Sequence, residues 1–589
     1  MFARCIVCRL IMVVLCWISL AGWAKAEDPP SAVGPLMTLL KSGRLPKERV
    51  GTVLEMICTR GNEHDLSYVF QQLTSAEGYQ GEMRLKAMRG LVEAAESRKV
   101  RPAGDLSKLG NLLTGDADKD TRLTALKLAG LWKPTGLDGA LKKLALGEQQ
   151  DKELFTNSLD ALVSIEGVKS QSVVEQLLAA GRPQWQRYLA VAALARFNLD
   201  AAAKQAAAVL KDGTAADDPA PLLDAFFIRK GGSEKLAAAV ADQTLSEDVL
   251  KMCLRYMYAT GRNAPELSAA LSKVPDPPPP TPDDIKRLSA EVAASGDAGR
   301  GEAIFRRADL SCLRCHAIHK AGGDVGPDLE SLGITSPIEY VVTSILLPSQ
   351  AIKEQYLTAI VATTDGEIFH GIVVEKSDEQ MILKDANGKR IRIAAADIDD
   401  KAEGKSLMPD GLTKFLTHQE LLDLARFISE LGKPGPYAIP ATTHLQRFRV
   451  LKNVPPDVAS EVPNVEIVRE KILAAGDDQW SPTYAQVSGV LPLKELSPLT
   501  VQNVLYLQGA VDVNEEGELT VQLDDAAGVS LWVDAEPFEG QRQTTVSLAP
   551  GVHTLTFRVD LAQRKATTLS VELLKPDNST AQFTAVGGR

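Results

Sequence analysis

A C-x-x-C-H pentapeptide constrains this chain more than any other feature of its sequence. Cys312 and Cys315 are separated by two residues, and His316 follows directly. With 7 cysteines and 7 histidines in 589 residues, chance would place this pattern about 0.001 times per chain. Two such thiols can form thioethers to a c-type haem, and the adjacent imidazole can ligate its iron. The motif therefore predicts one covalent haem c.

Two other uses of a C-x-x-C pair have less support. A zinc site would need two further ligands at a similar spacing, and the remaining candidates Cys58 and Cys253 are isolated in the sequence. A thioredoxin-like dithiol follows a strand of a βαβ unit, and no such pattern precedes Cys312. Cys58 and Cys253 lie in helical apolar patterns and are expected to be small buried side chains.

A covalent haem needs helices packed around it, and the flanking sequence predicts them. Gly301 and Phe305 are four residues apart and share one face of a helix that leads into the cysteines. Thr417 and Glu420 form a capping box that opens a second helix, which continues at helical spacing until Gly432 ends it. A glycine on the first helix lets an aromatic side chain from the second approach closely.

The segment 326–329, with the sequence Gly-Pro-Asp-Leu, predicts a turn beneath His316. A backbone carbonyl there can accept the Nδ1 proton and leave Nε2 for iron. Pro327 is therefore a candidate cofactor-binding residue.

Residues 296–437 resemble class I c-type cytochromes, and most closely the haem-binding domain of large secreted proteins from planctomycete and verrucomicrobial bacteria. The likeness rests on four motifs: Gly301-x-x-x-Phe305, Cys312-x-x-Cys315-His316, Gly326-Pro327-Asp328-Leu329, and the segment from Ser406 to Leu412. The resemblance implies that Met408 is the sixth iron ligand and that Pro409 stiffens its loop. A Met on a polar loop is also unusual for a core residue, although a gap-filling role stays open.

Four other side chains could compete with Met408 for the iron. His319 lies too near His316 to reach the opposite haem face, and Met381 belongs to an alternating strand. His418 is the first residue of the capped helix, and His370 has no motif around it. Each is expected to have an ordinary structural role.

The N-terminus predicts export. Arg4 and Arg9 precede an uncharged run, and Ala24 and Ala26 supply the small residues of a cleavage site. Residues 1–26 are therefore a signal peptide whose removal leaves no membrane span, and the location is periplasmic or otherwise exported. The net charge of −11 without long charged blocks argues against nucleic acid as a partner and could orient a basic redox protein.

Residues 27–274 are rich in Ala and Leu with helical periodicity, and they repeat. A pattern beginning at Arg84 recurs from Arg122, Phe155 and Arg187 at offsets of 38, 33 and 32 residues. This resembles HEAT or armadillo-like repeats; a non-repetitive helical bundle is the alternative. A proline-rich linker at 275–284 separates these repeats from the cytochrome domain at 285–437.

Two β regions complete the chain. Four strands between 356 and 400 predict a small antiparallel barrel inserted in the cytochrome domain, which covers a haem edge, docks a partner or holds the Met408 loop. Residues 438–589 keep period two and resemble a PA14-like β-sandwich, often a carbohydrate-binding module. In that family paired aspartates hold calcium in a glycan site, which makes Asp524 and Asp525 candidates.

The predicted fold class is multidomain: an all-α solenoid, an α cytochrome c domain with a β insertion, and a C-terminal β-sandwich. The predicted function is an exported monohaem cytochrome that carries single electrons, rather than an enzyme. A haem enzyme or gas or redox sensor with a labile sixth ligand, and an adhesion or scaffold protein, are the alternatives. No second C-x-x-C-H, Rossmann glycine fingerprint or nucleophile elbow is present in the sequence.

Overall fold

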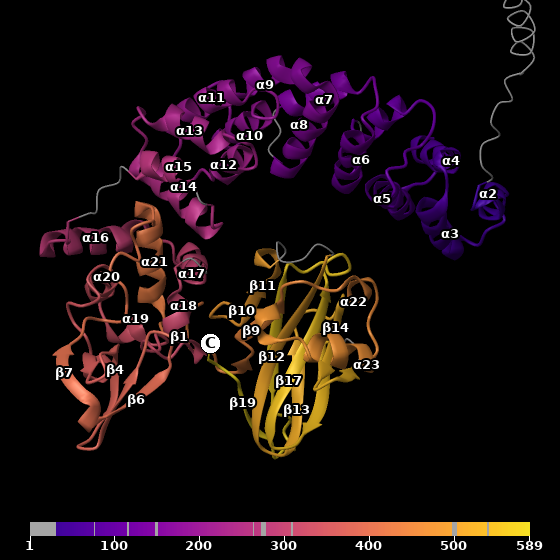
Figure 1. Cartoon of the computed structure of the whole chain (residues 1–589). Coiled ribbons are helices and arrows are strands. Elements are labelled where there is room, and N and C mark those ends of the chain that lie inside the picture. The colour runs from indigo at the N-terminus through magenta and orange to yellow at the C-terminus, as the bar shows by residue number, and fades with distance from the viewer. Residues whose placement is uncertain are drawn as a thin grey trace, which may run out of the picture. The chain divides into compact units, whose positions relative to one another are not determined.

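The computed structural model describes residues 31–75, 77–114, 117–147, 151–262, 264–272, 278–307, 310–496, 503–538 and 541–588. The predicted signal peptide at 1–26 lies outside these residues. The described chain divides into two compact units. The first contains residues 31–245 and Ala264–Leu271, and the second contains the rest, including Ser246 to Arg262. Figure 1 colours both units along the chain.

The first unit is helical in every described element. Its α-helices are α2 (Gly34–Lys41), α3 (Lys47–Arg60), α4 (Glu63–Thr74), α5 (Gly81–Ser97), α6 (Lys119–Trp132), α7 (Asp138–Leu146), α8 (Lys152–Glu166), α9 (Gln171–Leu177), α10 (Gln184–Leu194), α11 (Leu199–Lys211), α12 (Ala220–Phe227), α13 (Gly232–Val240) and α15 (Pro265–Leu271). Helices α3, α5, α6, α8, α10 and α12 each pack on the next as one row, and α11, α13 and α15 follow one another in the same way.

The sequence repeat coincides with this row of helices. Its four copies lie on α5, α6, α8 and α10, and the small residues within them, such as Ala125 and Ala190, are fully buried. Gly90 takes the place of a larger residue in the first copy because a Cβ there would lie 2.9 Å from the sulfur of Cys58. Cys58 and Cys253 are both buried, as predicted.

The second unit begins earlier than the expected domain boundary. Helix α14 (Glu247–Ala259) belongs to it, and Arg255 of that helix forms an ion pair of 2.7 Å with Glu420. The linker predicted at 275–284 also ends sooner, because Thr281 caps α16 (Pro282–Ser295) through a capping box with Asp284. Residues 275–277 of that linker lie outside the described chain.

The C-x-x-C-H segment is surrounded by short elements and two crossing helices. The elements are α17 (Ala298–Phe305), α18 (Cys312–Cys315), β1 (Ala317–Ile318), β2 (Ala321–Gly322), α19 (Leu332–Thr335), α20 (Ile338–Leu346) and α21 (His418–Glu430). Thr417 and Glu420 form the predicted capping box at the start of α21. Phe305 and Phe427 are buried where α17 meets α21, with their ring centroids 5.5 Å apart.

The insertion is an open sheet and not the barrel expected from the sequence. Its strands are β3 (Thr358–Thr363), β4 (Ile368–Lys376), β5 (Gln380–Lys384), β6 (Arg390–Ala394) and β7 (Ile398–Glu403), in the order β6-β5-β4-β3-β7. The two predicted hairpins are present. Strand β7 extends the insertion beyond residue 400. Its side chains are mostly exposed, so the sequence has no alternation of apolar and polar residues from which this strand could be predicted.

The C-terminal region contains two antiparallel sheets that enclose one core. One sheet has the order β10-β9-β12-β17-β14-β15 with β19 on β12, and the other has β11-β18-β13-β16 with β8 on β18. The strands are β8 (Thr443–His444), β9 (Arg447–Leu451), β10 (Trp480–Tyr484), β11 (Val490–Pro492), β12 (Val504–Glu515), β13 (Gly517–Leu523), β14 (Val529–Val533), β15 (Glu536–Phe538), β16 (Gln543–Leu548), β17 (Gly551–Asp560), β18 (Thr568–Leu574) and β19 (Gln582–Ala585).

Alternating residues of both sheets fill that core, and the apolar series predicted on β13, β14, β17 and β18 all belong to it. The opposite face of β12 is also covered: Val504 and Tyr506 pack with Trp480 and Trp532 and with residues of the helical segment 456–473. The chain is therefore multidomain, helical toward its N-terminus and built from antiparallel sheets toward its C-terminus. Within the described residues, no helix has the length and apolar character needed to cross a membrane.

Candidate functional site

His316 is held by the turn that the sequence predicts beneath it. Its Nδ1 lies 2.9 Å from the backbone oxygen of Pro327. A carbonyl can only accept, so Nδ1 carries the proton and Nε2 is left as the acceptor nitrogen. Burial lowers the pKa of His316, and the Pro327 carbonyl opposes this only in part. The ring is therefore neutral, which is the form that binds metal.

Backbone hydrogen bonds fix this turn against the C-x-x-C-H segment. The N–H of Gly326 donates to the oxygen of Cys315 at 2.7 Å, and the N–H of Leu329 donates to Ala317 at 2.9 Å. A Cβ at Gly326 would lie 2.5 Å from Cε1 of His316, so only glycine admits the imidazole this closely. The tautomer and the ring position of His316 are thus set before any ligand binds.

The two cysteines lie on one short helical turn. Helix α18 runs Cys312–Cys315, and the N–H of His316 closes it by donating to the oxygen of Cys312 at 2.9 Å. Leu313 between them is buried, whereas both cysteines are half-buried. Two thiols at this spacing, followed directly by a histidine, are the residues that could hold a c-type haem.

The crossing of α17 and α21 is as close as predicted from Gly301. A Cβ at Gly301 would lie 2.0 Å from the backbone oxygen of Asp423 and 2.7 Å from Cβ of Phe427. The buried Asp423 carboxylate accepts two hydrogen bonds from the Arg300 guanidinium, at 2.7 and 2.9 Å, and one from the N–H of Asp297 at 2.8 Å. The C-x-x-C-H motif therefore follows a close, hydrogen-bonded helix crossing.

Met408 lies on the loop between β7 and α21 and is half-buried. Its N–H donates to Oγ of Ser406 at 3.2 Å. The competing side chains have other partners: Met381 is 3% exposed in the core of the inserted sheet, and Nε2 of His418 pairs with Glu291 at 2.7 Å. Nε2 of His370 lies 3.2 Å from the backbone oxygen of Lys405.

His319, the remaining competitor, faces the C-terminal region. Its Nδ1 lies 3.2 Å from Nε2 of Gln446.

The buried Glu302 of α17 accepts a hydrogen bond of 2.7 Å from the N–H of Val487. Burial raises the pKa of Glu302, and the Val487 N–H opposes that shift. The contacts of His319 with Gln446 and of Glu302 with Val487 were not predicted from the sequence. No residue near Glu302 in the sequence indicates a partner 185 residues away.

The chain end also reaches the haem motif. Gly588 donates from its N–H to the oxygen of Lys320 at 2.7 Å and accepts from the N–H of Gly322 at 3.0 Å. These residues form the hairpin directly after His316. Arg306 adds a further link through a bidentate pair with Glu495, at 2.7 and 3.0 Å. The sandwich and the haem segment are thus bonded at both sides of the C-x-x-C-H motif.

The aspartates suggested as calcium ligands have a different partner. Asp524 accepts a hydrogen bond of 2.7 Å from the fully buried guanidinium of Arg564 and one of 3.2 Å from Oγ1 of Thr568. Asp525 accepts from the N–H of Ala527 at 3.0 Å. The guanidinium of Arg564 therefore occupies the position beside Asp524 where a calcium ion was suggested. The described part of the chain holds no group of three or more His, Cys, Asp or Glu side chains able to bind a metal ion.

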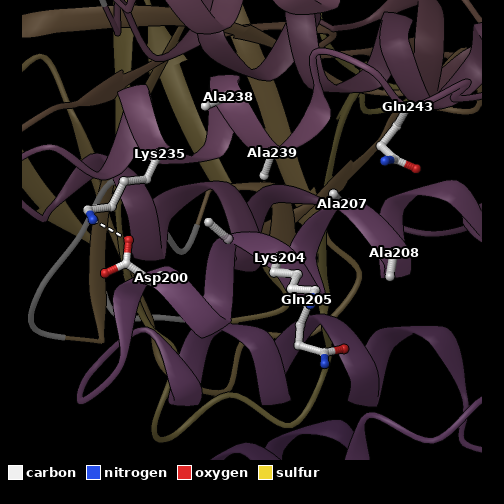
Figure 2. A pocket seen from close by; sticks show the side chains of 10 residues that line it. Asp200, Lys204, Gln205, Ala207, Ala208, Lys235, Ala238, Ala239 and Gln243 are labelled. Carbon is white, nitrogen blue, oxygen red and sulfur yellow. Dashed lines mark hydrogen bonds and ion pairs between the residues drawn. The ribbon is translucent and has the colours of Figure 1, made fainter.

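A groove of about 520 Å³ lies on the first unit, far along the chain from Cys312. Figure 2 shows that alanines of α11 and α13 line it and that Lys235 points to Asp200, with which it forms an ion pair. Small apolar side chains beside an exposed, satisfied pair offer no reactive group. None of the predicted site residues lies here.

No protein-family model matches this chain, and no curated protein matches it. Its chemistry therefore has to be argued from its own residues.

Proposed function

We propose that this chain is an exported c-type cytochrome that binds one haem through Cys312, Cys315 and His316 and carries single electrons. One observation carries the proposal: Nδ1 of His316 faces the Pro327 carbonyl at 2.9 Å, which leaves Nε2 as the acceptor nitrogen of a histidine that directly follows two cysteines on one helical turn. A dithiol redox site has no need of a histidine held in this way, and a zinc site would need a further ligand beside Cys312, Cys315 and His316. Bound haem would supply the one-electron couple between ferric and ferrous iron.

Met408 is the proposed sixth ligand. It lies on a loop, it is half-buried, and the competitors Met381, His370 and His418 are engaged elsewhere. A thioether opposite histidine raises the reduction potential and leaves no open coordination position. This arrangement suits a carrier, because a haem enzyme or gas sensor needs a vacant or labile sixth position.

The other regions have proposed roles in docking. The helical repeats at 27–274 resemble HEAT repeats and would bind a redox protein partner. The sandwich at 438–589 resembles PA14-like modules and would bind a partner or a glycan, without calcium at Asp524. Export through residues 1–26 agrees with haem c attachment, which in bacteria takes place outside the cytoplasmic membrane.

The test uses the full exported protein and a matched pair of variants. The wild type should keep its haem stain on a denaturing gel, and its ferric spectrum should show the weak charge-transfer band of a thioether ligand. Met408→Leu should abolish that band, admit carbon monoxide to the ferrous form and lower the reduction potential, because the soft sulfur favours ferrous iron. Met381→Leu removes a buried sulfur of the same volume and should change none of these.

Two outcomes would contradict the proposal. A wild type that loses its haem stain on denaturation has no thioethers. A wild type that keeps its haem, lacks the band and binds carbon monoxide readily would be a sensor or enzyme.

A further inference from the structure

The inserted sheet contacts the His316 side of the proposed haem site. Nζ of Lys384, at the end of β5, donates to the backbone oxygen of Asp324 and pairs with its carboxylate, both at 2.7 Å. The Lys384 side chain is only 12% exposed, whereas the Asp324 side chain is 83% exposed, so the bond to the backbone oxygen of Asp324 is the better protected of the two contacts. In the next turn, Asn387 accepts a hydrogen bond of 2.7 Å from Arg314, which lies between the two haem cysteines.

The same sheet holds the segment that leads to Met408. Oγ1 of Thr358 donates to the backbone oxygen of Lys405 at 2.8 Å, and Nε2 of His370 lies 3.2 Å from that same oxygen. A Cβ at Gly404 would lie 2.2 Å from Oγ1 of Thr358 and 2.7 Å from Nε2 of His370, so the sheet and this segment are in full contact. Lys405 is three residues before Met408.

These two contacts lie on one row across the sheet. Lys384 is paired with Ile372, and Ile372 is paired with Thr358, on three neighbouring strands. Gly404 continues the row, because its N–H donates to the oxygen of Thr358 at 3.0 Å. Adjacent strands lie about 4.8 Å apart, so the row spans roughly 14 Å between its ends. Ladder hydrogen bonds resist changes in that length.

We propose that the row from Lys384 to Gly404 is a rigid spacer that sets the separation between the His316 segment and the Met408 loop, with Thr358 and His370 as positioning residues for Met408. This inference rests on Met408 as the iron ligand. Without the sheet, the loop would keep the bond from the N–H of Ser406 to Oγ of Ser349 at 3.3 Å and its junction with α21, but the segment before Ser406 could move and carry the Met408 sulfur with it. Two donors on one carbonyl, three residues before the ligand, hold the loop at the point where such movement would begin.

The experiment compares two threonines on strand β3. Thr358→Val removes the hydroxyl that holds Lys405, and Thr363→Val removes an equally buried hydroxyl at the other end of the strand, where it bonds only within the β3–β4 turn. Hydrogen exchange of residues 404–410 and the affinity of the ferric protein for imidazole are measured for both. Thr358→Val should speed exchange there and raise imidazole affinity about fivefold, the value of one net hydrogen bond.

Thr358→Val combined with His370→Phe leaves the Lys405 carbonyl without these donors and should raise imidazole affinity roughly 10- to 100-fold. Thr363→Val should leave both quantities at wild-type values. The spacer is wrong if the two single variants behave alike, or if exchange quickens without a change in imidazole affinity. If the wild type shows no thioether band, the Met408 assignment fails instead, and the exchange measurement alone decides whether the row holds the loop.

Discussion

The close crossing of α17 and α21 can be tested by comparing two glycine-to-alanine variants in α17, because the gain in helix propensity is the same in both. Helix α17 contains Gly299 and Gly301, two residues apart. A Cβ at Gly301 would lie 2.0 Å from the backbone oxygen of Asp423, whereas a Cβ at Gly299 would meet Oδ1 of Asp297 at an ordinary 3.4 Å. Alanine favours a helix over glycine by about 1 kcal/mol at either position. The difference between Gly301→Ala and Gly299→Ala is therefore the steric cost at Gly301.

That cost can be bounded from the contact. The clash is with a backbone carbonyl, which cannot rotate away, so α17 must move from α21 by more than an ångström. Overpacking of a close-packed contact costs about 1 to 3 kcal/mol, and an immovable partner places this case at the upper end. A difference of about 3 kcal/mol corresponds to roughly 100-fold in the equilibrium for local opening.

Hydrogen exchange of the full-length protein measures that equilibrium directly. Amides in Ala298–Phe305 and His418–Glu430 should exchange roughly 100-fold faster in Gly301→Ala than in Gly299→Ala. Gly299→Ala should match or exceed the protection of the wild type. Equal protection in the two variants would show that the helices do not cross at Gly301 and that this crossing does not anchor the C-x-x-C-H motif.

Two further predictions concern pH. Burial raises the pKa of Glu302, so the stability that this residue contributes is complete below the ordinary Glu pKa of about 4.3 and is lost as the pH rises through the raised pKa. Glu302→Gln keeps an acceptor for the N–H of Val487. In urea unfolding, this variant should therefore show a smaller loss of stability with rising pH than the wild type. Burial lowers the pKa of His553, but Asp534 at 2.5 Å and the Ala549 carbonyl at 2.8 Å raise it overall. The sandwich should therefore lose stability above about pH 6.5, the ordinary His value, and His553→Gln should remove that dependence; a flat wild-type profile would contradict either assignment.

Local signals predicted the parts of the site that are close in the chain. The Pro327 carbonyl that holds His316 is only 11 residues away, and a Gly-Pro turn is sufficient to place it. The capping box of α21 and the alternating strands β13, β14, β17 and β18 were predicted for the same reason: propensity and period act within one element.

Elements defined by their tertiary partners could not be predicted in this way. Strand β12 carries apolar residues on both faces because a core lies on one side and the segment 456–473 on the other, so no alternation marks it. Strand β7 shows the opposite problem, since its side chains are largely solvated. Asp524 was a candidate calcium ligand, and its partner Arg564, 40 residues later, could not be found from local sequence.

If the chain carries electrons as proposed, the contacts around His316 give the sandwich and the inserted sheet a role. Reduction potential depends on ligand geometry and on solvent access to the iron, and both follow from how firmly the surrounding segments are held. The hairpin after His316 is bonded to Gly588, and α17 before it is bonded through Glu302 to Val487. The inserted sheet adds Lys384 on the same side and Thr358 on the Met408 side. Chain segments that are far from the motif in sequence thus hold the segments on both sides of it. A minimal domain cut at residue 437 would retain Cys312, Cys315, His316 and Met408 but lose the bonds from the sandwich.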